Sequence, residues 1–228
     1  MRNRPYRDHR GVAKYRHEVL AAILRVNERL EVLATPRSRD PFVGQWALIG
    51  GPVEVDETME QAIARHMTGH LSGARPVHVE QVSTVSDPAR DPFERTIATA
   101  YLALTPPDGL PEMVGNSWLP VDDLPNMAFD HAQIVSAAAR RLRSKTSYTN
   151  IVYALAPEEF TMARLRAIYQ AVLGHEVDVT NLGRVLRRRG QIEKTGDVAA
   201  PGERGGRPAS TWRLSLIHIS EPTRPLYI

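Results

Sequence analysis

Residues 50–70, GGPVEVDETMEQAIARHMTGH, decide the predicted fold of the first half of the chain. Two glycines follow the apolar residues 46–49, which predicts a short strand that enters a tight turn. Thr58 is a good N-cap, and the apolar residues after it recur at helical spacing as far as His70. The stretch therefore predicts a strand, an acidic loop and a helix.

The spacing within this stretch resembles the Nudix box, Gly-x5-Glu-x7-Arg-Glu-U-x-Glu-Glu-x-Gly-U, in which U is aliphatic. Gly51, Glu57 and Arg65 stand at the required positions. Three glutamates of the box are replaced, and the residues in their places are His66, Gly69 and His70. In Nudix hydrolases those carboxylates hold Mg²⁺ against a substrate diphosphate, and Mg²⁺ prefers oxygen ligands. The stretch therefore predicts a pocket that binds a nucleotide without cutting it, with no metal site and no catalytic residue.

Length and composition are those of a soluble protein with one or two domains. The chain has 228 residues, of which 42% are hydrophobic and 24% charged. It has no cysteine, which excludes disulfides, thiolate zinc sites and a cysteine nucleophile. No apolar run approaches the roughly 20 residues that span a bilayer. We therefore expect a cytoplasmic protein without a membrane partner.

Positive charge is concentrated near both ends of the chain. Residues 1–16 carry a net charge of +5, as do residues 180–213, whereas residues 17–179 carry −7. An acidic body with basic ends is consistent with binding to a polyanion. The alternative is a solvated surface on which the charge is merely uneven.

The first domain, predicted over residues 15–146, alternates strands with helices. A hairpin is predicted over residues 19–35 and a loop over 37–45, followed by the short strand, the turn and the helix that Thr58 caps. Further strands are predicted at 77–83 and 96–104, a turn with a short strand at 118–124, and a helix at 129–143. This order indicates an α/β fold, and the resemblance to the Nudix box makes it a Nudix-like α/β/α sandwich.

The second domain, predicted over residues 147–214, has the pattern of a winged helix-turn-helix. Thr161 caps a helix over 162–173 that ends at Gly174, and Asp178 caps a second helix over 179–189. The short separation between the two helices is typical of a helix-turn-helix. Strands at 191–195 and 210–214 flank a glycine-rich loop over 196–208, which predicts the wing.

The second of these helices carries polar side chains suited to DNA. Leu182, Val185 and Leu186 share its apolar face, and the opposite face is polar and basic. Candidate DNA-binding residues are Thr180, Asn181, Arg184, Arg187 and Arg188 on the helix, and Lys194, Arg204 and Arg207 in the wing. Alternatively, the arginines at the helix C-terminus only complement the helix dipole.

A degenerate Nudix box followed by a basic winged helix resembles the Nudix-related transcriptional regulators of the NrtR family. The resemblance covers residues 15–214 and is carried by residues 46–51, 90–92, 129–131, Phe160 and Thr161 with Tyr169, Asp178 with Asn181 and Arg184, and residues 206–208. It implies a homodimeric repressor of NAD synthesis or salvage genes that binds double-stranded operator DNA. It also implies release by an NAD-related effector such as ADP-ribose. We expect a mycobacterial or related actinobacterial member.

A diphosphate in this pocket must be held without a strong metal cage. Arg37 and Arg39 can supply guanidinium contacts, and the backbone amides of Gly50 and Gly51 can add more. The remaining residues of the expected ligand site are Trp46, Glu57 and Arg65. Trp46 can alternatively belong to the core, and Arg65 can orient the loop by pairing with Glu57.

Two other functions remain open at this stage. An active Nudix hydrolase could hold Mg²⁺ in an altered geometry through Glu54, Asp56, Glu57 and Glu60, or a transition metal through His66 and His70. The third possibility is a ligand sensor that acts through protein partners.

The two ends of the chain lie outside the two predicted domains. Residues 1–14 form a basic arm. Residues 215–228, taken with Leu214, resemble the translation of a transposase-type sequencing adapter, and we exclude them from the fold. The genomic nucleotides downstream of codon 214 decide this point.

Overall fold

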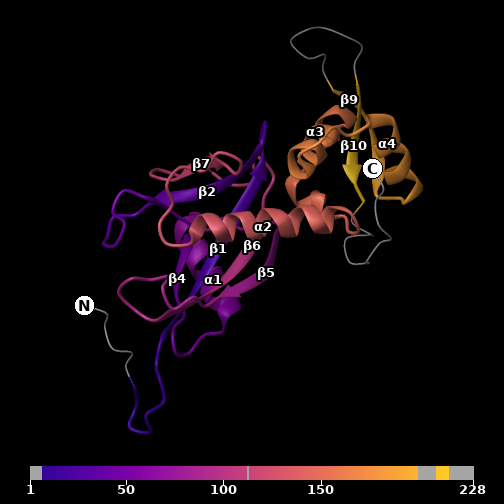
Figure 1. The fold of residues 1–228 in the computed structure, drawn as a ribbon. Helices are drawn as coiled ribbons and strands as arrows, with labels where there is room; N and C mark the ends of the chain where they lie inside the picture. Colours follow the sequence, from indigo (N-terminus) through magenta and orange to yellow (C-terminus); the bar gives the residue numbers. More distant parts are fainter. Residues whose placement is uncertain (1–6, 112, 200–208, 216–228) are drawn as a thin grey trace.

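The computed structural model of the protein describes residues 7–111, 113–199 and 209–215 (Figure 1). Its helices and strands, in chain order, are β1 (Arg16–Val26), β2 (Leu30–Pro36), β3 (Trp46–Ala47), β4 (Ile49–Pro52), α1 (Met59–His70), β5 (His78–Val85), β6 (Thr96–Leu104), β7 (Ser117–Pro120), α2 (His131–Thr146), the 3₁₀ helix η1 (Ile151–Leu155), β8 (Phe160–Thr161), α3 (Met162–Leu173), α4 (Val179–Arg188), β9 (Ile192–Ala199) and β10 (Ala209–Leu214).

A mixed sheet forms the centre of the first domain. Its strands follow the order β3-β2-β1-β6-β5, with β4 paired to β1 and β7 paired to β2. The long strand β1 lies parallel to β6 and antiparallel to β2 and β4. Six consecutive residues of β1, 19–24, are buried, because α1 packs on one face of the sheet and α2 on the other (Figure 1). This is the predicted α/β/α sandwich.

Helix α1 begins where the sequence predicts. The Thr58 hydroxyl accepts a hydrogen bond from the Gln61 amide, and the Gln61 side chain accepts one from the Thr58 amide, which completes a capping box. The helix buries Ala62, Ile63 and Met67 against the sheet. The prediction of a Gly-Gly turn before it is wrong in one respect. Gly50 and Gly51 belong to strand β4, since a glycine can pack its backbone directly against a neighbouring strand.

Helix α2 begins two residues later than predicted. Phe129 has a left-handed backbone with φ of 52°, which prevents it from starting the helix. The carboxylate of Asp130 does not cap the helix but accepts two hydrogen bonds from the Arg90 guanidinium, at 3.0 and 2.8 Å. Arg90 is buried, so this ion pair ties the start of α2 to the loop before β6.

The second domain has the predicted helix pair and a small sheet. The Thr161 hydroxyl caps α3, Gly174 ends it with φ of 76°, and the Asp178 carboxylate caps α4. The three-stranded sheet has the order β8-β10-β9. Strand β9 continues through Gly196 to Ala199, where the sequence predicted loop, because the ladder with β10 extends that far. Arg204 and Arg207 lie outside the described residues.

The two domains share one continuous core. The buried helix η1 begins a few residues after residue 146, where the first domain was predicted to end. Arg164 of α3 donates to the carbonyls of Val26, the last residue of β1, and Asn27, at 2.8 and 2.6 Å. Arg143 of α2 donates to the Val172 carbonyl of α3 at 2.8 Å. Helix α2 therefore runs from the sheet to the winged helix and contacts both (Figure 1).

The ends of the chain are described only in part. Residues 7–14 of the predicted basic arm lie at the end of the first domain that is remote from the winged helix (Figure 1). The Ser215 amide donates to the Gln191 carbonyl at 2.9 Å, and residues 1–6 and 216–228 lie outside the described part. Within the described ranges, no helix is both long and apolar enough to cross a membrane.

The Arg90–Asp130 pair generates a stability prediction. Among the described residues, Asp130→Ala leaves the buried Arg90 charge with one carboxylate, that of Glu18 at 4.0 Å, so we expect the free energy of unfolding to fall by about 3 kcal/mol. Replacing both Arg90 and Asp130 with Leu should destabilise less than Asp130→Ala, since no unpaired charge remains. Urea unfolding measures both effects. Asp122→Ala, at an exposed site, serves as the control, and an equal loss in this control would contradict the prediction.

Candidate functional site

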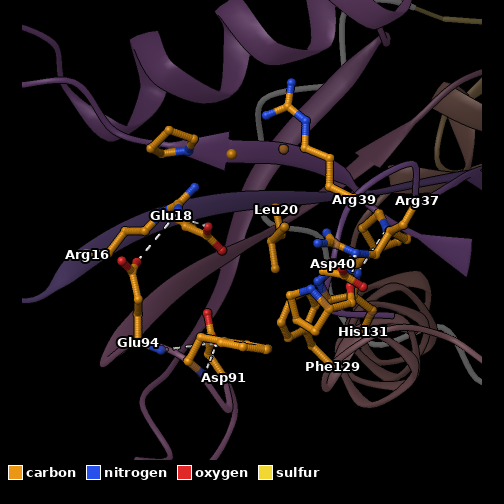
Figure 2. Close-up of a pocket in the computed structure, with 17 residues that line it drawn as sticks. Arg16, Glu18, Leu20, Arg37, Arg39, Asp40, Asp91, Glu94, Phe129 and His131 are labelled. Atoms are coloured by element: carbon orange, nitrogen blue, oxygen red, sulfur yellow. Dashed lines mark hydrogen bonds and ion pairs between the residues drawn. The ribbon is translucent and has the colours of Figure 1, made fainter. Parts of the chain in front are cut away.

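A cavity of about 480 Å³ opens on the α2 side of the sheet, beside the first turn of α2 (Figure 2). Its walls come from the start of β1, the loop after β2, strand β4, the loop before β6 and the residues that begin α2. Of the residues predicted to bind a ligand, four line it: Arg37, Arg39, Gly50 and Gly51. The other three, Trp46, Glu57 and Arg65, are not among its lining residues.

One wall combines a guanidinium with an aromatic ring. The Arg37 guanidinium lies 4.8 Å from the centroid of the Phe129 ring, and its Nε donates to the Pro41 carbonyl at 2.8 Å. Phe42 packs edge-on against the same ring at 5.0 Å. Arg39 lines the cavity from the same loop (Figure 2). This wall therefore offers positive charge and an apolar face side by side.

The opposite wall is charged, and sequence reasoning did not assign it to the ligand site. Arg16 pairs with Glu18 at 2.9 Å and with Glu94 at 3.7 Å, and both glutamates line the cavity (Figure 2). Asp91 holds the loop by accepting hydrogen bonds from the amides of residues 93 and 94. Asp91 belongs to residues 90–92, which carried part of the family resemblance, so that signal could have identified this residue of the wall.

His131 is buried at the base of the cavity and is neutral. Its Nδ1 accepts a hydrogen bond from the Leu48 amide at 3.0 Å, so the ring proton sits on Nε2. Burial lowers the pKa of His131 to about 3, and the positive charges of Arg90 and Arg37 act in the same direction against the opposing charge of Asp130. The imidazole therefore remains a neutral N–H donor across the physiological pH range.

The two glycines of β4 are required by close packing. A Cβ on Gly50 would lie 2.0 Å from the Val19 carbonyl oxygen. A Cβ on Gly51 would lie 2.5 Å from Cε1 of His66. The glycines thus allow β4 to lie against both β1 and α1 where it borders the cavity.

Glu57 and Arg65 orient the loop before α1. Arg65 donates through Nε to a Glu57 carboxylate oxygen at 2.9 Å and through Nη2 to the Pro52 carbonyl at 3.0 Å. Glu57 also accepts from the Glu54 amide at 2.8 Å. Arg65, and after it this amide, lowers the pKa of Glu57 to about 2. Trp46 is half-buried and packs on the core, which is the alternative weighed for it above.

The residues at the metal positions of the Nudix box do not fit Mg²⁺. The His66 ring hydrogen-bonds to the Pro52 carbonyl at 3.0 Å, and Gly69 has no side chain that could act as a ligand. Burial and then the charge of His66 lower the pKa of His70. Within the described residues, no group of three or more His, Asp or Glu side chains is placed to hold a metal ion.

Helix α4 presents the predicted DNA-binding face on the winged helix. Thr180, Arg184 and Arg188 are exposed on it. Arg184 donates through Nη2 to the Asn181 side-chain oxygen at 2.9 Å, so these two residues form one polar unit. Arg187 is exposed but turns toward the wing, where its guanidinium lies 5.9 Å from the centroid of the Trp212 ring. Lys194 of β9 is exposed beside the same ring.

Known families match both domains of the chain. Residues 15–138 match the NUDIX domain, and residues 152–214 match the NrtR DNA-binding winged helix domain. The ADPR responsive transcriptional repressor NtrR of Acinetobacter baylyi is 29% identical over 203 residues, which are 86% of this chain and 80% of the relative.

Solved structures match the same arrangement. NrtR of Shewanella oneidensis in complex with a 27mer DNA superposes with a TM-score of 0.81 and 27% identity, covering 92% of this chain and 98% of that one. The NUDIX domain of the same protein, in complex with ADP ribose, superposes with a TM-score of 0.52 and 29% identity over 59% of this chain and 93% of that one.

The buried histidine generates a pH prediction. Below about pH 6.5 the unfolded chain protonates His131, whereas the folded chain does not until the pH approaches 3. Stability is therefore fully present above pH 6.5 and falls as the pH drops, by about 1.4 kcal/mol per pH unit from this residue. His131→Asn, whose side-chain oxygen can replace Nδ1 as acceptor, should remove this contribution. Urea unfolding of both proteins at pH 7.5 and 5.5 measures it, and a stability difference that is the same at the two pH values would contradict the assignment.

Proposed function

The chain belongs to the Nudix family and carries the NrtR type of winged helix, and from this we propose that it is a DNA-binding transcriptional repressor whose Nudix domain senses an NAD-related nucleotide such as ADP-ribose. Its targets on this proposal are genes of NAD synthesis or salvage, and it acts as a homodimer in the cytoplasm. The observation that carries the proposal is the likeness of both domains together to a repressor bound to DNA.

The cavity supports a nucleotide effector. Arg37 and Arg39 supply guanidinium groups suited to a diphosphate, because the planar fork of Arg binds phosphate oxygens in pairs. Phe129 and Leu20 offer apolar surface, and His131 lines the base as a neutral ring. Gly50 and Gly51 bring the backbone of β4 to the cavity wall, where it can meet a ligand. Trp46, Glu57 and Arg65 support this site from outside the cavity.

The replaced Nudix-box residues favour sensing over hydrolysis. The Glu57 carboxylate, which survives, is bound by Arg65 and the Glu54 amide, and His66 is bonded to a carbonyl. No carboxylate stands at positions 66, 69 and 70, where Nudix hydrolases hold Mg²⁺. The proposal is therefore a protein that binds its nucleotide without a catalytic residue and without a metal cofactor.

Helix α2 supports communication between the nucleotide and the DNA. Its first turn carries His131 in the cavity wall, and Arg143 near its other end is bonded to α3 of the winged helix. A helix is a rigid element, so a ligand that shifts its first turn also shifts its contact with α3. Effector binding and DNA binding are then linked through one element.

DNA binding by the full chain, measured by fluorescence anisotropy with fragments selected from genomic DNA, tests the function. We expect sequence-specific binding that ADP-ribose reverses. Arg184→Ala should weaken binding to the selected fragment by about 1–3 kcal/mol, or roughly 5- to 160-fold, and leave binding to random DNA nearly unchanged. Arg39→Ala should retain DNA binding but respond only to higher concentrations of ADP-ribose.

A matched control is Arg140→Ala, which removes the same side chain from an exposed position on α2. If this control and Arg184→Ala lost the same affinity for the selected fragment, the assignment of α4 as the DNA-reading helix would be wrong. Incubation with ADP-ribose and Mg²⁺ separates the sensor from an altered Nudix hydrolase. Many turnovers to AMP per protein molecule would overturn the proposal that the chain does not cut its ligand.

A further inference from the structure

The indole of Trp212 in strand β10 lies at the junction between helix α4, the proposed recognition helix, and the wing. Trp212 of β10 stands directly opposite Lys194 of β9 in the antiparallel ladder, so their side chains share one face of the small sheet. On the same face, Ile192 is buried opposite Leu214. The apolar end of this face therefore packs into the core and its other end presents Trp212 and Lys194.

Two cations from different elements meet at this ring. The Lys194 ammonium is 5.7 Å from the centroid of the indole, and the Arg187 guanidinium of α4 is 5.9 Å from it. Both distances lie within the range of a cation–π attraction. The ring thus joins a charge on the recognition helix to a charge on the wing strand.

Arg187 is held in this direction by the helix that carries it. Its Nε donates to the Gly183 carbonyl at 2.9 Å, one turn earlier in α4. A Cβ on Gly183 would lie 3.2 Å from Cε of Met162 in α3 and 3.9 Å from Nη2 of Arg187. The glycine therefore allows close packing of α3 on α4 and leaves room for the Arg187 guanidinium beside it.

Neither cation has a carboxylate partner within the described residues. The ion pairs described in the winged helix are Arg166 with Glu176 and Arg213 with Glu193. Glu193 lies on the other face of the sheet, because side chains alternate along the strand, and Arg213 stands opposite it there. Arg187 and Lys194 therefore present two positive charges that repel each other, and a shared anion would remove this repulsion.

We propose that Arg187 and Lys194, both placed by Trp212, form a phosphate-binding site that grips the DNA backbone between the recognition helix and the wing. This inference rests on the proposed function. It separates Arg187 from the base-reading unit of Asn181 and Arg184, with which the sequence grouped it. Trp212 is a positioning residue, because its ring places the two cations and does not itself need to contact DNA.

Phosphate is the chemistry that fits this pair. Lys is a point charge without a directional pattern of donors, and the Arg187 Nε is already used by the Gly183 carbonyl. A duplex presents one negative charge per about 1.7 Å of its axis, so a pair of cations at the edge of a groove meets phosphates before base edges. Contacts to phosphate orient the protein and carry no sequence information.

Salt-dependent binding of full-length variants tests the site. The variants are Arg187→Gln, Lys194→Gln, the double substitution, Trp212→Leu and Trp212→Phe, each with the selected genomic fragment and a scrambled duplex of equal length. Each single Gln variant should weaken binding to both duplexes alike and reduce the slope of log K against log salt by about 0.9, and the double by about 1.8. Trp212→Leu should weaken binding to both duplexes, whereas Trp212→Phe, which keeps an aromatic ring, should retain most of the binding.

Arg213→Gln is the matched control, since this neighbour of Trp212 is paired with Glu193 and should leave the salt slope unchanged. Loss restricted to the selected fragment would overturn the inference, because it would make the pair a base-reading unit. The inference would also be overturned if both Gln variants bound DNA with the affinity and salt slope of the unchanged protein. The proposed function would still stand in that case, because the unchanged protein binds DNA. A parent protein that binds neither duplex would refute the proposed function, and this site with it. If Trp212→Leu fails to fold by circular dichroism, the two Gln variants still decide the outcome.

Discussion

The buried ion pair between Arg90 and Asp130 is the interaction on which the working parts of this protein depend. It fixes the start of α2, and directly beside it stand Phe129 and His131, which form part of the cavity wall. A buried charge needs its partner, so the pair tolerates little movement. The other end of the same helix is bonded to α3 through Arg143. One electrostatic constraint therefore positions the helix that borders the cavity at one end and contacts the winged helix at the other.

The altered Nudix box keeps its loop and helix in place although three of its glutamates are replaced. Glu57 and Arg65 still bond to each other and to the backbone of the loop, which is a structural task that needs no metal. His66 occupies a ligand position and fills it with a hydrogen bond to Pro52. The loop and the helix are thereby kept in place beside the cavity, which suits a protein that senses a nucleotide.

On the proposed assignment, the winged helix divides its positive charge between base edges and the DNA backbone. Arg184 is bonded to Asn181 on the exposed face of α4, where donors and acceptors can meet base edges. Arg187, only three residues further, is held on Trp212 together with Lys194. The periodicity of a helix alone cannot separate these residues, because the difference lies in what β10 brings next to them.

Local signals in the sequence determined the elements and their order: the Thr58, Thr161 and Asp178 caps, the helical apolar spacing and the glycine at position 174 all act over a few residues. The spacing of Gly51, Glu57 and Arg65, and the loss of the acidic residues after them, could be recognised for the same reason. Only the tertiary structure decided three features: the charged wall of Arg16, Glu18 and Glu94, the neutral state of His131, and the orientation of Arg187. Each feature depends on groups that are distant in the chain. Burial and electrostatic pairing depend on which groups are close in space, and local sequence does not specify this.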